Sequence, residues 1–89
     1  ETVYALEISG DSMEPAYRAG DRIIVAPGAE VKKGDRVVAK TTGGEVMAKV
    51  LARRNSRTVA LASLNPDYPV REFKPGEIAW IARILWASQ

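Results

Sequence analysis

The sequence predicts a mainly β fold, with one small and strongly twisted domain that spans residues 1–89. Glycine occurs seven times and proline five times at short intervals, and short β-rich runs lie between them. A length of 89 residues fits a single small domain. A content of 46% hydrophobic and 27% charged residues is typical of globular rather than disordered chains.

Turn signals bound each of these runs. In the first run, apolar side chains alternate with Ala5 and Glu7, which predicts a strand with one buried face. Gly43 and Gly44 separate two later runs and predict a β-hairpin with a two-residue turn. The expected strands are residues 4–8, 22–26, 36–42, 45–53, 57–63 and 77–86. Residues 13–18 are expected to form a helical turn, because Pro15 suits the first turn of a helix.

The residue types that the chain lacks narrow its chemistry. Without cysteine or histidine there is no disulfide, thiol nucleophile, Cys/His metal site or Ser-His-Asp triad, and we expect no cofactor and no metal. A net charge of +2 argues against nucleic-acid binding, and the cluster Arg53, Arg54 and Arg57 is expected on a solvated turn. No apolar run could span a bilayer and no signal peptide is recognisable, so we expect a cytoplasmic protein that does not bind membranes.

The main candidate for a nucleophile is Ser12. It follows the first expected strand, after Gly10 and before a Met-x-Pro turn. A hydroxyl at such a corner can face a cleft, with neighbouring backbone N–H groups available to an oxyanion. A serine also needs a base to remove its proton, and without histidine that base must be Lys, Asp, Glu or Tyr.

Lys49 is the best candidate for that base, because Met47 and Leu51 should share its face of the strand. A lysine in solution titrates near ~10.4, and apolar surroundings lower that pKa and make a neutral amine available. Lys40 is the rival. A two-residue turn would place both lysines on one face of the hairpin, as diagonal neighbours, and Lys40 would then lower the pKa of Lys49 or act as the base itself.

Each of these residues also has an interpretation without catalysis. A serine such as Ser12 is more often a turn or capping residue than a nucleophile. A lysine in a strand usually points to solvent or protects a sheet edge. On residue chemistry alone, a Ser-Lys peptidase is therefore the minority hypothesis.

A resemblance to known proteins makes the Ser-Lys peptidase the favoured hypothesis. Ser9-Gly10-Asp11-Ser12-Met13-Glu14-Pro15, followed by residues 17–21, resembles the nucleophile motif of the LexA and phage-repressor family of serine peptidases. Residues 45–54 resemble the strand that carries the lysine base of that family, and Lys49 lies 37 positions after Ser12, which is typical of its soluble members. Residues 63–69 resemble the segment that often follows in phage-type repressors. The resemblance covers nearly the whole chain.

The resemblance implies a partly open β-barrel of the LexA and signal-peptidase type. Ser12 would attack a peptide carbonyl, Lys49 would take its proton, and the Ser12 amide would stabilise the oxyanion, with Asp11 and Met13 shaping the pocket. Such domains self-cleave in a segment before the nucleophile, often at Ala-Gly, and relieve repression by releasing an N-terminal DNA-binding domain. In members of the SOS response, an activated recombinase filament stimulates this cleavage.

Only 11 residues precede Ser12, so we expect the DNA-binding domain and the cleavage segment to lie outside this chain. Three other interpretations remain open: a non-catalytic dimerisation module of a transcription regulator, an accessory protein of an error-prone polymerase, and a signal-peptidase-like enzyme. The last is disfavoured, since no membrane anchor is recognisable.

The C-terminal run predicts a second role, in self-association. Trp80 and Trp86 have the same parity as Ile78, Ala82 and Ile84, so one face of the last strand should be large and apolar. Part of that face must be core. In the resembling family, C-terminal segments contribute to dimerisation, and an apolar strand with aromatic residues would suit a twofold interface. We therefore expect a homodimer.

Overall fold

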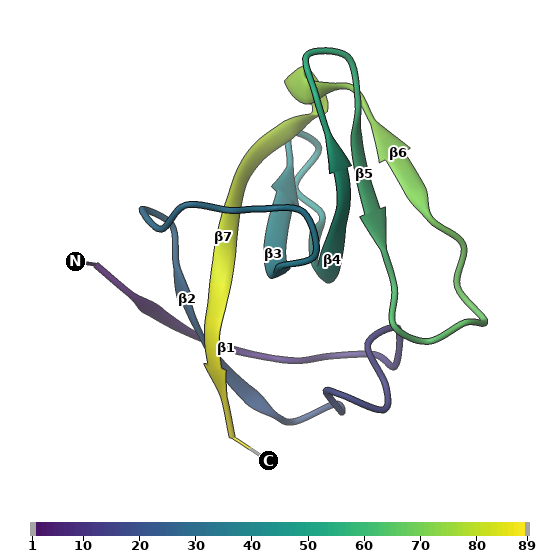
Figure 1. The fold of residues 1–89 in the computed structure, drawn as a ribbon. Helices are drawn as coiled ribbons and strands as arrows, with labels where there is room; N and C mark the ends of the chain where they lie inside the picture. The colour runs from purple at the N-terminus through teal and green to yellow at the C-terminus, as the bar shows by residue number, and fades with distance from the viewer. Residues whose placement is uncertain (1, 89) are drawn as a thin grey trace.

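A computed structural model describes residues 2–88 and is mainly β, as predicted. Its strands form a seven-stranded sheet in the order β1-β2-β7-β3-β4-β5-β6, and all neighbours pair antiparallel. The elements are β1 (Tyr4–Glu7), β2 (Arg22–Ala26), β3 (Arg36–Thr41), β4 (Val46–Arg54), β5 (Val59–Ala62), β6 (Arg71–Phe73), the 3-10 helix η1 (Pro75–Glu77) and β7 (Ile78–Ala87). The sheet curls strongly, and its edge strands β1 and β6 do not pair with each other, so the described residues form a partly open barrel (Figure 1).

Most expected strands are present with ends that differ by one or two residues. The strand β6 was not predicted, since a run of three residues is too short to show an alternating pattern. The helical turn expected at residues 13–18 is present only as one helical hydrogen bond, from the Tyr17 N–H to the Met13 carbonyl at 3.0 Å, and these residues otherwise form turns and bends. The Arg18 N–H donates to the Asp21 carboxylate at 2.9 Å, which diverts it from a helical hydrogen bond. In the part of the chain that the structure describes, no helix is long and apolar enough to cross a membrane.

Two apolar clusters fill the curled sheet. The first packs Met13 and Tyr17, from the segment between β1 and β2, against buried residues of β2, β3 and β7. The second lies between β3, β4 and β5 and includes Val37, Met47 and Leu51. The segment that carries Ser12 is thus anchored in the first cluster, whereas the strand that carries Lys49 contributes to the second.

The β3–β4 hairpin differs from the two-residue turn that the sequence predicted. The Thr41 N–H donates to the Glu45 carbonyl at 2.8 Å, so residues 42–44 form a three-residue loop. Gly44, the last loop residue, has a φ of +97°. A left-handed residue at this position is typical of three-residue hairpin loops that contain a bulge, and glycine adopts it without steric cost.

This loop shifts the register of the hairpin by one residue. Lys49 pairs with Val37, and Lys40 pairs with Val46. Because successive side chains of a strand point to opposite faces, the shift places Lys40 and Lys49 on opposite faces of the sheet. The expectation that both lysines share one face is therefore wrong.

The last strand also departs from its predicted parity. Trp80 and Ala82 pair with Lys40 and Val38, and so share a face, but register shifts interrupt the pairing near both ends of β7. As a result Trp86 lies on the face opposite to that of Ala82. The single large apolar face expected for this strand is therefore wrong. Trp80 and Trp86 are both exposed, on different faces.

Candidate active site

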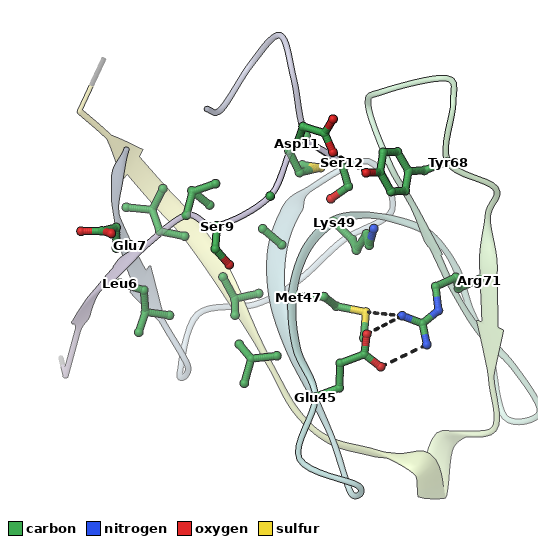
Figure 2. Close-up of a pocket in the computed structure, with 17 residues that line it drawn as sticks. Leu6, Glu7, Ser9, Asp11, Ser12, Glu45, Met47, Lys49, Tyr68 and Arg71 are labelled. Carbon is green, nitrogen blue, oxygen red and sulfur yellow. Dashed lines mark hydrogen bonds and ion pairs between the residues drawn. The ribbon is translucent and has the colours of Figure 1, made fainter. Parts of the chain in front are cut away.

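The candidate residues from the sequence meet at one cavity of about 480 Å³. Its walls come from β1 and the loop that follows, from β2, β3 and β4, from Tyr68 before β6, and from Arg71 of β6 (Figure 2). The cavity is apolar where Leu6, Ile23 and Val38 line it. Figure 2 shows Glu7 and Ser9 on the same side as Leu6, and most other charged and polar groups on the opposite side.

Ser12 is half-buried on the wall formed by the segment between β1 and β2. This segment leaves β1 through Gly10, whose φ of +77° favours glycine, and returns toward β2. Its two ends are joined by backbone hydrogen bonds, from Ile8 N–H to the Asp21 carbonyl at 2.8 Å and from Gly20 N–H to the Ile8 carbonyl at 2.9 Å. The structure therefore presents the Ser12 hydroxyl on a closed, tethered loop.

Asp11 and Met13, expected to shape the pocket, also line the cavity. The Met13 side chain is only 2% exposed and packs in the first apolar cluster, so it anchors the segment as well. The Asp11 carboxylate accepts a short hydrogen bond from the Tyr68 hydroxyl. That bond and the Asp11 charge raise the pKa of Tyr68 above its ordinary value.

Lys49 lies on β4 and is 6% exposed, with Met47 and Leu51 buried on the same face. Burial is the main reason that the pKa of Lys49 lies below the ordinary lysine value, since a buried ammonium loses its hydration. The nearby Arg71 charge lowers the pKa further, and the Glu45 charge opposes both effects. The aromatic ring of Tyr68 is 5.7 Å from the amine, a distance at which a ring attracts a cation.

The hydrogen-bond partner of Lys49 is Ser63, which no sequence pattern indicated as a site residue. Lys49 Nζ donates a hydrogen bond of 2.7 Å to Ser63 Oγ, whereas no hydrogen bond joins it to Ser12. Ser63 follows β5, and the pairing of Val50 with Ala62 brings it opposite Lys49. The register of β4 and β5, rather than any local motif, is the signal that identifies Ser63.

Lys40, the rival base, does not line this cavity within the described residues. Its half-buried side chain lies on the other face of the sheet, across from Val46 and Trp80. The geometry therefore distinguishes two lysines that the sequence could separate only weakly.

An ion pair that was not anticipated closes the charged side of the cavity. Arg71 binds Glu45 through two hydrogen bonds, of 2.7 and 3.1 Å, and both residues line the cavity beside Lys49 (Figure 2). The pair lowers the pKa of Glu45 and raises that of Arg71. The two residues are 26 positions apart and Arg71 belongs to the unpredicted β6, so no sequence pattern linked them.

A twisted β-barrel that brings a serine and a buried lysine to one cavity is a peptidase-type domain in its architecture. The family model described as Peptidase S24-like matches residues 1–85. The match covers nearly the whole chain, and the protein belongs to this family. The family and the fold expected from the sequence are both confirmed.

Proposed function

We propose that this chain is a serine peptidase domain in which Ser12 is the nucleophile and Lys49 is the general base. The observation that carries the proposal is the burial of the Lys49 amine in the cavity that Ser12 also lines. Burial disfavours the ammonium form, so a neutral amine able to accept a proton is more accessible than for a solvated lysine. Membership of the Peptidase S24-like family supports the same reaction class.

The reaction would proceed in two stages. Ser12 Oγ bonds to the peptide carbonyl carbon while its proton passes to Lys49 Nζ. The C–N bond then breaks, and Lys49 returns the proton to the leaving amine. Water attacks the resulting ester and gives a proton to Lys49. As the ester C–O bond breaks, Lys49 passes this proton to Ser12 Oγ, which restores the serine. The Ser12 N–H makes no hydrogen bond with the described residues, so it is available to the carbonyl oxygen as negative charge develops there.

One rearrangement precedes the first stage. Lys49 donates to Ser63, so its amine must turn toward Ser12 or bridge the two hydroxyls when a substrate fills the cavity. Catalytic hydrogen bonds often shorten only in the substrate complex, so the observed geometry is compatible with this step. Ser63 acts in this scheme as the positioning residue that holds the amine at the cavity wall.

The substrate that we propose is a segment of the same polypeptide upstream of Ser12, in a regulator that loses its DNA-binding domain on cleavage. An attached substrate has a high effective concentration, so a modest site can still cleave it. DNA would then be bound only by that upstream domain. A recombinase filament would be the inducer, and the resemblance of residues 9–15, 17–21 and 45–54 to repressor peptidases supports this extension.

The test uses the natural full-length protein. It is incubated between about pH 6 and about pH 10, a range that spans the titration of a lowered lysine pKa, and fragments are identified by mass spectrometry. We expect cleavage at one site that accelerates with pH, and we expect Ser12→Ala and Lys49→Met each to abolish it. Ser9→Ala and Lys40→Met are the matched controls, since Ser9 also lines the cavity and Lys40 lies on the same hairpin. Cleavage that survives Ser12→Ala would refute the proposal.

A non-catalytic dimerisation module is the second candidate, favoured by the hydrogen bond that directs Lys49 to Ser63 instead of Ser12. Tyr4 and Trp80 are exposed and line a second cavity of about 520 Å³ with Pro27, whereas Trp86 lies on the other face of β7. We propose that this surface forms a homodimer interface. Sedimentation should give a dimer that Trp80→Ser weakens, and a monomer at high micromolar concentration would refute it. A polymerase accessory protein would be distinguished by the sequence upstream of Ser12.

A further inference from the structure

The loop that joins β5 to β6 contacts both candidate catalytic residues. Its first residue, Ser63, accepts the hydrogen bond from Lys49. Two positions later, the Asn65 N–H donates to the Ser12 carbonyl at 3.0 Å. The path from the base to the nucleophile thus runs through three successive residues of one loop.

Asn65 makes more than one contact with the nucleophile segment. Its side-chain Nδ2 donates to the Asp11 carbonyl at 3.0 Å, next to the bond that its backbone makes with Ser12. Its Oδ1 accepts the Asp67 N–H at 3.0 Å, which fixes the orientation of the amide group. One side chain therefore orders its own loop and holds the backbone on the N-terminal side of Ser12.

Tyr68, later in the same loop, contacts both the nucleophile segment and Lys49. Its hydroxyl donates to the Asp11 carboxylate, and its ring faces the Lys49 amine. Tyr68 is 42% exposed and lines the cavity, so it stabilises the fold little through burial. Its contacts are instead concentrated on the residue before Ser12 and on Lys49.

The Ser12 segment has other attachments besides this loop. The backbone hydrogen bonds at Ile8 and Gly20 connect the segment to itself, directly before β2. Met13 and Tyr17 attach it to the first apolar cluster. Ala48 and Val50 of β4 pack against the same cluster, so the core also sets the general position of the segment relative to β4. The loop of residues 63–68 adds direct hydrogen bonds beside Ser12 to these apolar contacts.

We propose that Asn65 and Tyr68 are positioning residues that hold Ser12 in register with Lys49. This inference rests on the proposed peptidase function and adds two residues that act through their neighbours. A misplacement of about 1 Å at a reacting group can reduce a rate by about a hundredfold. Loss of either contact should therefore lower the rate of attack by Ser12 without altering the titration of Lys49.

The experiment measures the reaction of Ser12 with a fluorophosphonate, a serine-directed electrophile, on the 89-residue chain. Saturation kinetics give the maximal labelling rate, kinact, and the half-saturating concentration, KI, across the pH range. We expect Asn65→Ala to lower kinact about tenfold to a hundredfold, and Tyr68→Phe, which keeps the ring, about threefold to tenfold. In both variants KI and the midpoint of the pH profile should remain unchanged.

Two matched controls separate positioning from loss of structure. Asn55 makes a similar turn, accepting the N–H groups of Arg57 and Thr58, but lies at the other end of β5, so Asn55→Ala should leave kinact unchanged. Tyr4→Phe alters an exposed tyrosine outside this cavity and should also have no effect. Thermal melts verify that each variant is folded at the assay temperature, and Tyr68→Phe, at an exposed position, should fold normally.

The outcomes that overturn each proposal can be distinguished. If the chain is not labelled at Ser12, or if labelling persists in Ser12→Ala, the proposed function fails and this inference fails with it. If labelling depends on Ser12 and Lys49 but is as fast in Asn65→Ala and Tyr68→Phe as in the unmodified chain, only the positioning role is overturned. A rise in KI with kinact unchanged would also overturn it, because that result indicates a role in binding.

Discussion

The two regions that carry the candidate residues are built in opposite ways. Lys49 belongs to a regular, buried hairpin, where cross-strand pairing fixes the face of the sheet to which each side chain points. Ser12 belongs to an irregular segment of turns that is held by a few hydrogen bonds and by two buried anchors, Met13 and Tyr17. A buried strand can hold an amine in apolar surroundings that disfavour its charged form. A tethered loop can instead expose a hydroxyl to a cleft. The difference indicates that the base is fixed by the sheet, and the nucleophile by buried anchors together with contacts between loops.

The largest effect on the cleavage rate should come from replacing Lys49, the lysine that the sheet buries. Lys49→Met is expected to lower the rate of Ser12-dependent cleavage at least about a thousandfold, since the serine then has no base. Lys40→Met removes the same charge from the other face of the hairpin and should leave the rate within about twofold. Equal losses in both variants would show that the register does not decide which lysine acts.

The same variant should stabilise the fold. The pKa of Lys49 is lowered in the folded state, so folding is penalised at pH values below that pKa, and the penalty disappears as the pH rises through the window up to about 10.4. Lys49→Met should therefore raise the free energy of unfolding at neutral pH, with a gain that shrinks toward alkaline pH. Urea unfolding at several pH values measures it, and a gain independent of pH would contradict burial of the ammonium as the cause.

The next largest effect on the cleavage rate is expected from the hydrogen bond with Ser63 that anchors the Lys49 amine. Ser63→Ala removes the acceptor of the 2.7 Å bond from Lys49 and leaves the rest of β4 unchanged. We expect a loss of about tenfold in the cleavage rate, because the amine becomes free to adopt other rotamers. Ser56→Ala, in the exposed turn between β4 and β5, is the matched control. A Ser63→Ala variant as fast as the unmodified protein would show that Lys49 needs no second hydroxyl.

Glycine at position 44 is predicted to fix the hairpin register on which the placement of Lys49 depends. Gly44→Ala should destabilise the fold by about 1 kcal/mol, because the backbone there has a φ of +97° while nothing crowds an added methyl group. Gly43→Ala should be close to neutral, since its added Cβ would meet only Thr41 Oγ1 at 3.8 Å. Chemical denaturation of the two variants compares them directly, and equal costs would rule out the left-handed backbone as the reason.

The sequence could predict some residues of this site and not others. The difference depends on whether the structure around each residue is local in sequence. The strand pattern and the motif around Ser12 are local, so the mainly β fold, the cavity-lining Ser12 and the buried Lys49 could be anticipated. The faces of Lys40 and Trp86 could not, because a three-residue loop in one case and a bulge in the other shifted the parity by one residue.

Ser63 illustrates the limit best. The Asn55 N–H donates to the Thr58 carbonyl, and a regular ladder continued from that turn would place Leu64 opposite Lys49. The register shift between Leu51 and Arg53 moves the pairing by one residue and brings Ser63 there instead. Bulges of this kind depend on how the curled sheet closes, which no window of sequence contains.

The smallest predicted effect is on the pH dependence of the cleavage rate, and it comes from the ion pair of Glu45 and Arg71 beside Lys49. The Glu45 charge raises the pKa of Lys49 and the Arg71 charge lowers it. Glu45→Gln should therefore move the rising limb of the pH–rate profile to lower pH, and Arg71→Gln should move it to higher pH. Both shifts should be no more than a few tenths of a pH unit, because solvent screens this exposed pair. Arg53→Gln, which breaks a similar exposed pair with Glu72, is the control and should leave the midpoint unchanged. Midpoint shifts of the same sign in Glu45→Gln and Arg71→Gln would mean that the pair acts by shaping the cavity wall. Midpoint shifts of opposite sign would mean that the pKa of Lys49 responds to the two charges, although its strand is fixed.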